Sequence, residues 1–187
     1  MIKASDHSLS ASAITPELRA DILRQFRLPR HSVHGPSHWA RVRYNGMLLS
    51  QASGADWQVV ELFAFIHDSQ RYDDGYDRDH GPRAADYALQ TCGKLFQLSD
   101  SQLEMLVKAC MGHTHEHLTS CVTVQTCWDA DRLDLARVGI IPDPYYLGTD
   151  LAKDPQMIAQ AIARSRGQSS KTHGIIDGLE ESLSPLE

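Results

Sequence analysis

The chain has 187 residues, 42% of them hydrophobic, and carries a formal net charge of −6 at pH 7. This length suits one domain with a sizeable core, since two full domains would each be small. The acidic balance disfavours a polymeric nucleic-acid ligand, although it does not disfavour a small nucleotide. No apolar run approaches the roughly 20 residues of a membrane span, and the N-terminus lacks the apolar stretch of a secretory signal. We therefore expect a cytoplasmic protein that does not bind membranes.

The first half of the chain predicts three helices. Thr15, Pro16 and Glu17 are typical of a helix start, and this helix should run to about residue 26. A second helix is expected over about 36–52, after a Gly-Pro break, and a third over about 55–69. Apolar residues cover most of the third helix, which predicts that it lies at the centre of the fold.

The second half predicts four more helices, over about 82–95, from Ser99 or Asp100 to 113, over 122–138 and over 154–165. The first of them follows a segment, 71–81, that is rich in turn formers and charged residues. The run Val122-Thr123-Val124 could pass for a strand, but no alternating segment nearby could pair with it. We predict an all-α, single-domain helical bundle over 15–166, with a loose N-terminal segment (1–14) and a C-terminal tail (167–187).

The adjacent pair His67-Asp68 is the most informative local feature. It ends the apolar stretch 59–66, and a buried carboxylate is costly unless a cation or hydrogen-bond donors satisfy it. Imidazole and carboxylate together suit zinc, manganese, iron, cobalt or nickel. A lone buried His is more often a hydrogen-bonded core residue, so the surroundings of the pair decide its interpretation. Upstream, His38 begins a predicted helix, and downstream Asp131 lies in an acidic helical segment, 128–134.

This order of residues resembles the HD superfamily, whose members are mostly metal-dependent phosphohydrolases. The likeness covers about residues 30–140. It implies an HD-type helical domain in which His38, His67, Asp68 and Asp131 hold a metal ion. The segment around Asp131 is also similar to a subset of uncharacterised bacterial HD proteins, which supports the fold more than the substrate.

Two further His residues resemble the binuclear branch of the same superfamily. His80 stands in a His-Gly-x-x-Ala helix start, and His113 ends an Ala-x-x-x-His-Thr segment. The resemblance implies that they complete a second site and that Asp68 bridges the two ions. Each could instead cap a helix end or face solvent, and His115 is the best substitute for His113. One or two divalent transition metal ions are therefore expected.

Several other residues are candidates for binding substrate or supporting the ligands. Arg71, one turn after the His-Asp pair, is the preferred phosphate-binding and catalytic cation. Arg71, Arg83 and Arg132 could each equally be a solvated charge or part of an ion pair. The remaining candidates for substrate binding are Arg83, Arg132 and Tyr72. His34 is a candidate for contacting the substrate or for supporting a ligand from behind, and Asp129 is a candidate for supporting a ligand or for pairing with a cation.

The expected activity is hydrolysis of a phosphate ester or anhydride in a small nucleotide-like molecule by a metal-activated hydroxide. One alternative is a diiron oxygenase, since a few HD proteins with a similar ligand set have that activity. Another is a module that binds a nucleotide without turnover. The expected partner is a small phosphorylated molecule, and a homodimer is possible.

Overall fold

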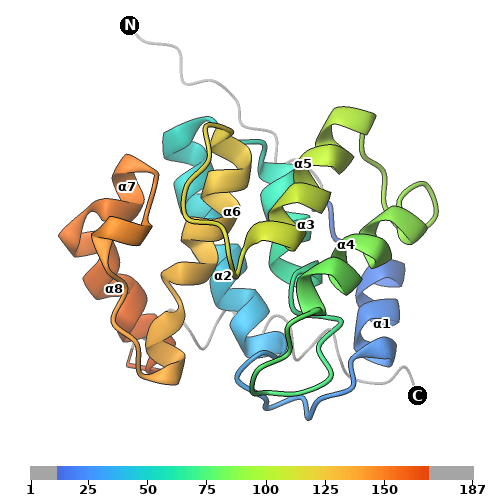
Figure 1. Cartoon of the computed structure of the whole chain (residues 1–187), viewed down its shortest axis with the longest axis horizontal. Helices are drawn as coiled ribbons and strands as arrows, with labels where there is room; N and C mark the ends of the chain where they lie inside the picture. The colour runs from blue at the N-terminus through green and yellow to red at the C-terminus, as the bar shows by residue number, and fades with distance from the viewer. Residues whose placement is uncertain (1–11, 169–187) are drawn as a thin grey trace, which may run out of the picture.

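Within residues 12–168, the part of the chain that this computed structural model describes, every regular element is helical (Figure 1). The α-helices are α1 (Pro16–Gln25), α2 (Pro36–Ser53), α3 (Trp57–Ile66), α4 (His80–Thr91), α5 (Asp100–Gly112), α6 (Val122–Arg132), α7 (Asp150–Lys153) and α8 (Pro155–Ser165). Two short 3₁₀ helices, η1 (Leu135–Val138) and η2 (Pro144–Tyr146), lie between α6 and α7. The prediction of a single all-α domain is confirmed.

Side-chain caps begin several of these helices where the sequence predicted a start. The Thr15 hydroxyl accepts a hydrogen bond from the Leu18 amide at the start of α1. Ser99, rather than Asp100, caps α5 and forms a reciprocal capping box with Gln102. These bonds satisfy amide groups that the first helical turn leaves without partners. The local sequence therefore fixes where these helices begin.

Helix α3 is the centre of the core, as its composition predicted. Every residue from Val59 to Ile66 is buried, and α3 packs against α2, α5 and α6. Gly46 of α2 allows one close approach, because a Cβ atom there would lie 2.5 Å from a methyl group of Val60. Helices α4 and α5 pack together on one side of this centre, and α7 and α8 lie on the other side (Figure 1).

Several boundaries differ from the prediction, including the end of α4, which lies at Thr91 and not near 95. Helix α3 ends at Ile66, and α4 begins already at His80. Helix α6 stops at Arg132 because the chain tightens there: the Asp134 amide bonds to the Asp131 carbonyl, three residues back, and η1 follows. Val122-Thr123-Val124 forms the first turn of α6 and no strand. The short helix α7 was not predicted.

The predicted terminal segments fall largely on residues 1–11 and 169–187, outside the described part of the chain. Among the helices of residues 12–168, none is both long enough and apolar enough to cross a membrane.

Candidate metal centre

The six predicted ligands come from α2 to α6, and each lies near a helix end. His38 is in the first turn of α2, and His67 and Asp68 directly follow α3. His80 begins α4, His113 directly follows α5, and Asp131 is in the last turn of α6. Because these helix ends converge, residues separated by more than 90 positions in the sequence meet at one buried place.

The first group comprises His38, His67, Asp68 and Asp131. The Nε2 atoms of His38 and His67 are 3.1 Å apart. His38 Nε2 lies 3.5 Å from Asp68 Oδ2 and 3.4 Å from Asp131 Oδ1. His67 Nε2 lies 3.6 Å and 3.8 Å from the same two oxygens. His38, His67 and Asp68 therefore each offer a ligand atom within 4.8 Å of the others, and Asp131 lies beside the two imidazole nitrogens.

The second group shares Asp68 with the first. The Nε2 atoms of His80 and His113 are 2.8 Å apart. They lie 3.4 Å and 3.8 Å from Asp68 Oδ1, the oxygen that does not face the first group. Each carboxylate oxygen of Asp68 thus serves one group, which is the arrangement of a bridging carboxylate. His113, and not His115, takes part in this group.

In all four His residues the Nδ1 atom faces an oxygen acceptor. His38 Nδ1 is 2.7 Å from the Asp134 carboxylate, and His67 Nδ1 is 3.0 Å from the Phe63 carbonyl. His113 Nδ1 is 2.7 Å from the Cys110 carbonyl, and His80 Nδ1 bonds to the Asp77 carbonyl. A carbonyl or carboxylate can only accept, so we assign the proton of each neutral ring to Nδ1. Each Nε2 then presents a lone pair toward the centre of its group, as a metal ligand requires.

These lone pairs test whether the residues fit a metal ion. Two neutral imidazoles that point their lone pairs at each other at 3.1 Å or 2.8 Å repel unless a proton or cation lies between them. Two carboxylates, Asp68 and Asp131, add negative charge at the same place. Imidazole nitrogen and carboxylate oxygen are suitable ligands for divalent transition metals. The buried His and Asp residues could therefore hold metal ions in both groups.

The pKa values of His67, His80, Asp68 and Asp131 agree with this interpretation, whereas Asp68 raises that of His113 against the effect of burial. Burial lowers the pKa of His67 to about 3, and burial together with His113 lowers that of His80 to about 4. Burial alone would raise the pKa of Asp68, yet His67 and a hydrogen bond with His113 hold it well below its ordinary range. Asp131 behaves alike, because His38 and His67 outweigh its burial and lower its pKa. At neutral pH the carboxylates are ionised, and His67 and His80 are neutral ligands.

Acid should destabilise the metal-free protein. The unfolded chain binds protons on His67 and His80 below about pH 6.5, whereas the folded protein does so only toward pH 3 or 4. The free energy of unfolding should then be full above pH 6.5 and fall as the pH drops toward 4. Asp68 raises the pKa of His113 against the effect of burial. The stability that protonated His113 contributes is therefore present below pH 6.5 and is lost only at higher pH, outside the range from pH 6.5 to 4. Thermal unfolding in chelator from pH 7 to 4 measures the slope, which should be shallower in His80→Gln; an unchanged slope in that variant contradicts the assignment.

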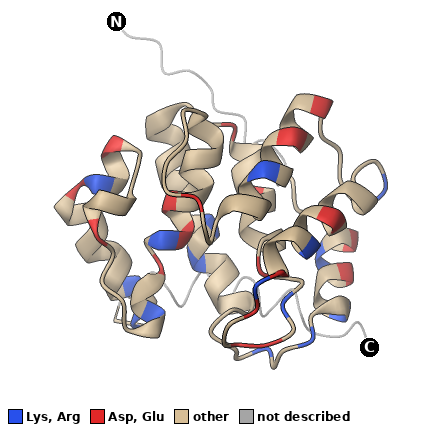
Figure 2. Cartoon of the chain, viewed as in Figure 1, with Lys and Arg blue, Asp and Glu red and all other residues tan. Residues whose placement is uncertain are grey.

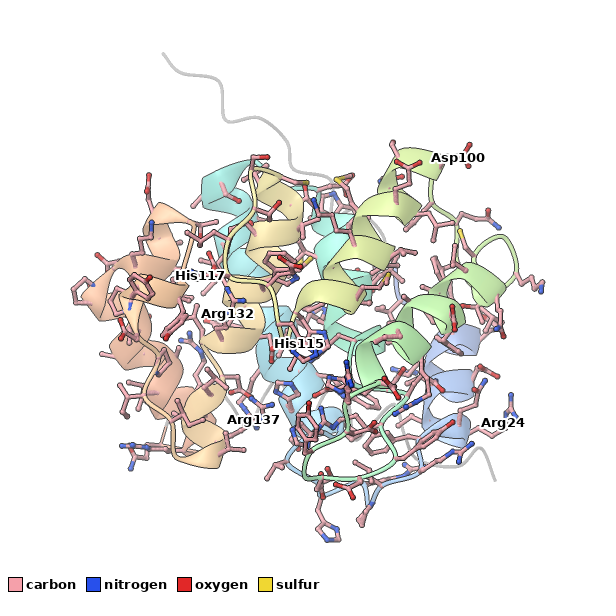
Figure 3. The ribbon with its side chains drawn as sticks, viewed as in Figure 1. Arg24, Asp100, His115, His117, Arg132 and Arg137 are labelled. Carbon is pink, nitrogen blue, oxygen red and sulfur yellow. The ribbon has the colours of Figure 1, made fainter. Side chains whose placement is uncertain are left out.

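A pocket of about 330 Å³ opens onto the second group. Asp68, His80, His113 and Asp131 line it, whereas His38 and His67 are fully buried behind them. The exposed His115 also lines the pocket, as do Arg132 and Arg137, and Figure 3 labels these three residues. A molecule that enters the pocket therefore meets the second group first.

Arg71 lies where the sequence placed a phosphate-binding cation. Its side chain is buried, with Nη1 3.3 Å from Asp68 Oδ1 and 3.1 Å from His80 Nε2. The Thr114 hydroxyl is 3.3 Å from the same His80 nitrogen, and sequence reasoning did not find this residue. Both donors would lose His80 Nε2 as an acceptor if that nitrogen bound a metal, and they would then be available to an oxygen in the pocket.

Asp134, rather than Asp129, supports a predicted ligand. Besides His38 Nδ1, the Asp134 carboxylate accepts hydrogen bonds from Arg41 Nε at 2.7 Å and from the Ser165 hydroxyl at 2.6 Å. Burial alone would raise its pKa, yet the bonds with His38 and Arg41 lower it to about 2. The carboxylate thus stays ionised and fixes the His38 ring. The sequence held a signal for this, since residues three apart on a helix share a face and Asp134 follows Asp131 by three.

The structure places Asp129 away from both groups. Its oxygens accept from the Gly148 and Thr149 amides, the Thr149 hydroxyl and the Gln125 amide group, at 2.7 to 3.1 Å. Asp129 is fully buried, and it holds the segment before α7 against α6. Its predicted role behind a metal ligand therefore does not match the geometry.

Asp129→Ala should consequently lower stability without changing metal content. The substitution leaves several buried donors without an acceptor, at a cost of roughly 3 kcal/mol. For a chain of this size, that corresponds to a fall in Tm of about 6 to 12 °C. Calorimetry measures the fall, and elemental analysis of the same sample measures the metal. Loss of metal at an unchanged Tm would restore Asp129 to a supporting role.

Two predicted substrate contacts lie outside the pocket. The Tyr72 ring is held between the guanidinium groups of Arg27 and Arg83, at 4.0 and 3.9 Å from its centroid. Arg83 also bonds to the Gln70 carbonyl at 3.0 Å and to Asp77 at 2.5 Å. Both side chains thus have partners within the protein, and neither lines the pocket.

Arg132 and His34 do line the pocket. Arg132 donates to the carbonyls of His117 and Tyr146 at 2.7 and 2.8 Å, and to that of Glu116. It therefore holds two loops together beside the pocket. His34 bonds to Asp74 at 3.1 Å, and burial lowers its pKa. No bond from His34 to a predicted ligand is present among residues 12–168, so its geometry favours the substrate side.

Comparison with known proteins identified no family: no family model, curated protein or solved structure matches this chain. The helical fold with a buried His/Asp cluster is compatible with an HD domain, and that likeness rests on the motifs and the geometry described above.

Proposed function

We propose that this protein is a metal-dependent phosphohydrolase that cleaves a phosphate ester or anhydride bond in a small, nucleotide-sized molecule. The observation that carries the proposal is the pair of His/Asp groups joined by Asp68, with four Nε2 lone pairs turned inward. When bound there, divalent ions would lower the pKa of a water molecule toward neutrality and offset charge on the phosphate.

The residues around the groups support phosphate chemistry. Arg71 is a buried cation beside Asp68 and His80, and a guanidinium can donate two parallel hydrogen bonds to a phosphate group. The Thr114 hydroxyl offers another donor on the same side. Because His80 and His113 line the pocket whereas His38 and His67 do not, a phosphate would enter between His80, His113 and these donors. The first group would hold its ion behind them, shielded from solvent.

The test begins with metal content per chain, by mass spectrometry, on protein purified without chelators or an affinity metal. Two ions per chain are expected. Hydrolysis is then measured in manganese or cobalt, as phosphate release from a monoester and an anhydride and as alcohol release from a diester, in the wild type and in His31→Gln. His31 is exposed and serves as the control for loss of a His.

Three results would contradict the proposal in distinguishable ways. Oxygen consumption by iron-loaded protein, without phosphate release, would indicate the oxygenase alternative. Tight nucleotide binding without turnover in any metal would indicate a binding module. Absence of metal after reconstitution would exclude both metal-dependent activities.

A further inference from the structure

Arg137 is a buried cation that faces the pocket, and the hydrolysis described above makes no use of it. Its side chain is only 8% exposed. Nε donates to the Val33 carbonyl at 2.8 Å and lies 3.9 Å from the Asp134 carboxylate, which partly offsets the charge, and Nη1 donates to the Asp134 carbonyl at 3.2 Å. Across residues 12–168, the remaining nitrogen, Nη2, has no hydrogen-bond partner. This atom is accessible to solvent. Since Arg137 lines the pocket, the free N–H groups are accessible from there.

The wall of the pocket away from the ligands is cationic. Arg78, from the 71–79 loop, lines it and is exposed, and Arg132, whose guanidinium is bonded to backbone carbonyls, contributes from α6. Basic residues lie on both the segment after α6 and the loop before α4 (Figure 2). Apart from the ligands Asp68 and Asp131, the acidic residue that lines the pocket is Asp77, which is bonded to Arg83. This local charge contrasts with the net charge of −6 for the whole chain.

The size and lining of the pocket limit what the substrate can carry besides its anionic groups. A volume of about 330 Å³ is at the lower end of the roughly 300–1,000 Å³ that ligand pockets span. Leu135 is the only aliphatic side chain that lines it within the described range, and Tyr72 is held elsewhere. Tyr76 lines the mouth, but it is 83% exposed. The pocket therefore lacks an enclosed apolar surface for a purine or pyrimidine base.

We propose that the pocket has a second anion subsite, anchored by Arg137 with Arg78 at the mouth, and that the substrate is a compact molecule with two anionic groups. One group, a phosphate, would lie at the His/Asp centre, and the other, a phosphate or carboxylate, would lie on Arg137. This inference rests on the proposed function for the position of the first group. The subsite narrows the expected substrates to small molecules that carry two anionic groups and no purine or pyrimidine base.

The test uses pairs of probes that differ in the second anionic group. Manganese-loaded protein is titrated calorimetrically with 3-phosphonopropionate and propylphosphonate, and with phosphonoacetate and ethylphosphonate. The carboxylate-bearing probe of at least one pair should bind roughly 10-fold more tightly, because only its carboxylate can accept charge-assisted hydrogen bonds from Arg137. In Arg137→Gln this preference should fall to about 2-fold or less, while the Kd of the alkylphosphonate, which lacks the carboxylate, changes little.

Arg24→Gln is the matched control, because Arg24 is 71% exposed and lies on α1 at the margin of the molecule, away from the pocket (Figure 3). It should keep the full preference. Arg78→Ala removes an exposed cation and should reduce the preference about 3-fold, which provides a test if Arg137→Gln folds poorly or loses manganese.

Equal affinity within both pairs in the wild type would overturn the subsite while leaving the proposed function intact. An unchanged preference in the Arg137 and Arg78 variants would also overturn it. Failure of both manganese and the simple phosphonates to bind would instead contradict the proposed function on which the subsite rests.

Discussion

Replacing Asp68 with Ala is expected to remove both metal ions and to lower kcat/KM for phosphate release more than about 1,000-fold, or about 4 kcal/mol of transition-state stabilisation. The reason is that Asp68 Oδ2 belongs to one group of ligand atoms and Oδ1 to the other. A single substitution therefore removes a ligand from each. Elemental analysis and single-substrate kinetics measure the two losses.

The helical signal in circular dichroism should stay near that of the wild type in Asp68→Ala, because α3 is complete before this residue. The control is Asp86→Ala, which removes an exposed carboxylate from α4. It should retain metal and activity. Full activity in Asp68→Ala would exclude the bridging role and the proposed mechanism with it.

Replacing Asp134 should weaken metal binding at the first group selectively. Asp134→Asn preserves the size of the side chain but removes the charge that holds His38 Nδ1–H and Arg41. We expect metal affinity at the first group to fall roughly 10- to 100-fold, which is the usual cost of losing such a partner. Affinity at the second group should stay within about 3-fold of the wild type, since His80 and His113 bond to backbone carbonyls instead.

Asp134→Ala adds a cost in stability, because Arg41 and the buried His38 lose their shared carboxylate. Removing one member of a buried ion pair costs about 3–5 kcal/mol. Competition with a chromogenic chelator measures the affinities, and calorimetry measures the stability. Asp100→Asn, at the exposed start of α5, is the control (Figure 3). Two ions bound with wild-type affinity in Asp134→Asn would show that His38 needs no orienting carboxylate.

The contrast between Asp129 and Asp134 shows what a local pattern can and cannot decide. Positions 129 and 131 point about 200° apart on a helix, which excludes Asp129 as a direct companion of Asp131. The same geometry places Asp134 within about 60° of Asp131, so the sequence contained the relevant signal. Which neighbour each carboxylate bonds to depends on α2 and on the segment before α7, and both are distant in the chain.

The sequence by itself determined the all-α class, the cap of α1 at Thr15, the start of α5 at Ser99 or Asp100 and the central position of α3. These features follow from periodicity and capping, which act over a few residues, whereas the set of six candidate ligands rests on the resemblance to the HD superfamily. Only the tertiary structure decided that Asp68 faces two groups, that Nε2 rather than Nδ1 points inward, and that the Arg83 guanidinium packs over the Tyr72 ring. It also decided that Arg137 keeps a free nitrogen beside the pocket. The physical reason is that a polar side chain can bond to several partners, and the long-range packing of the helices selects among them.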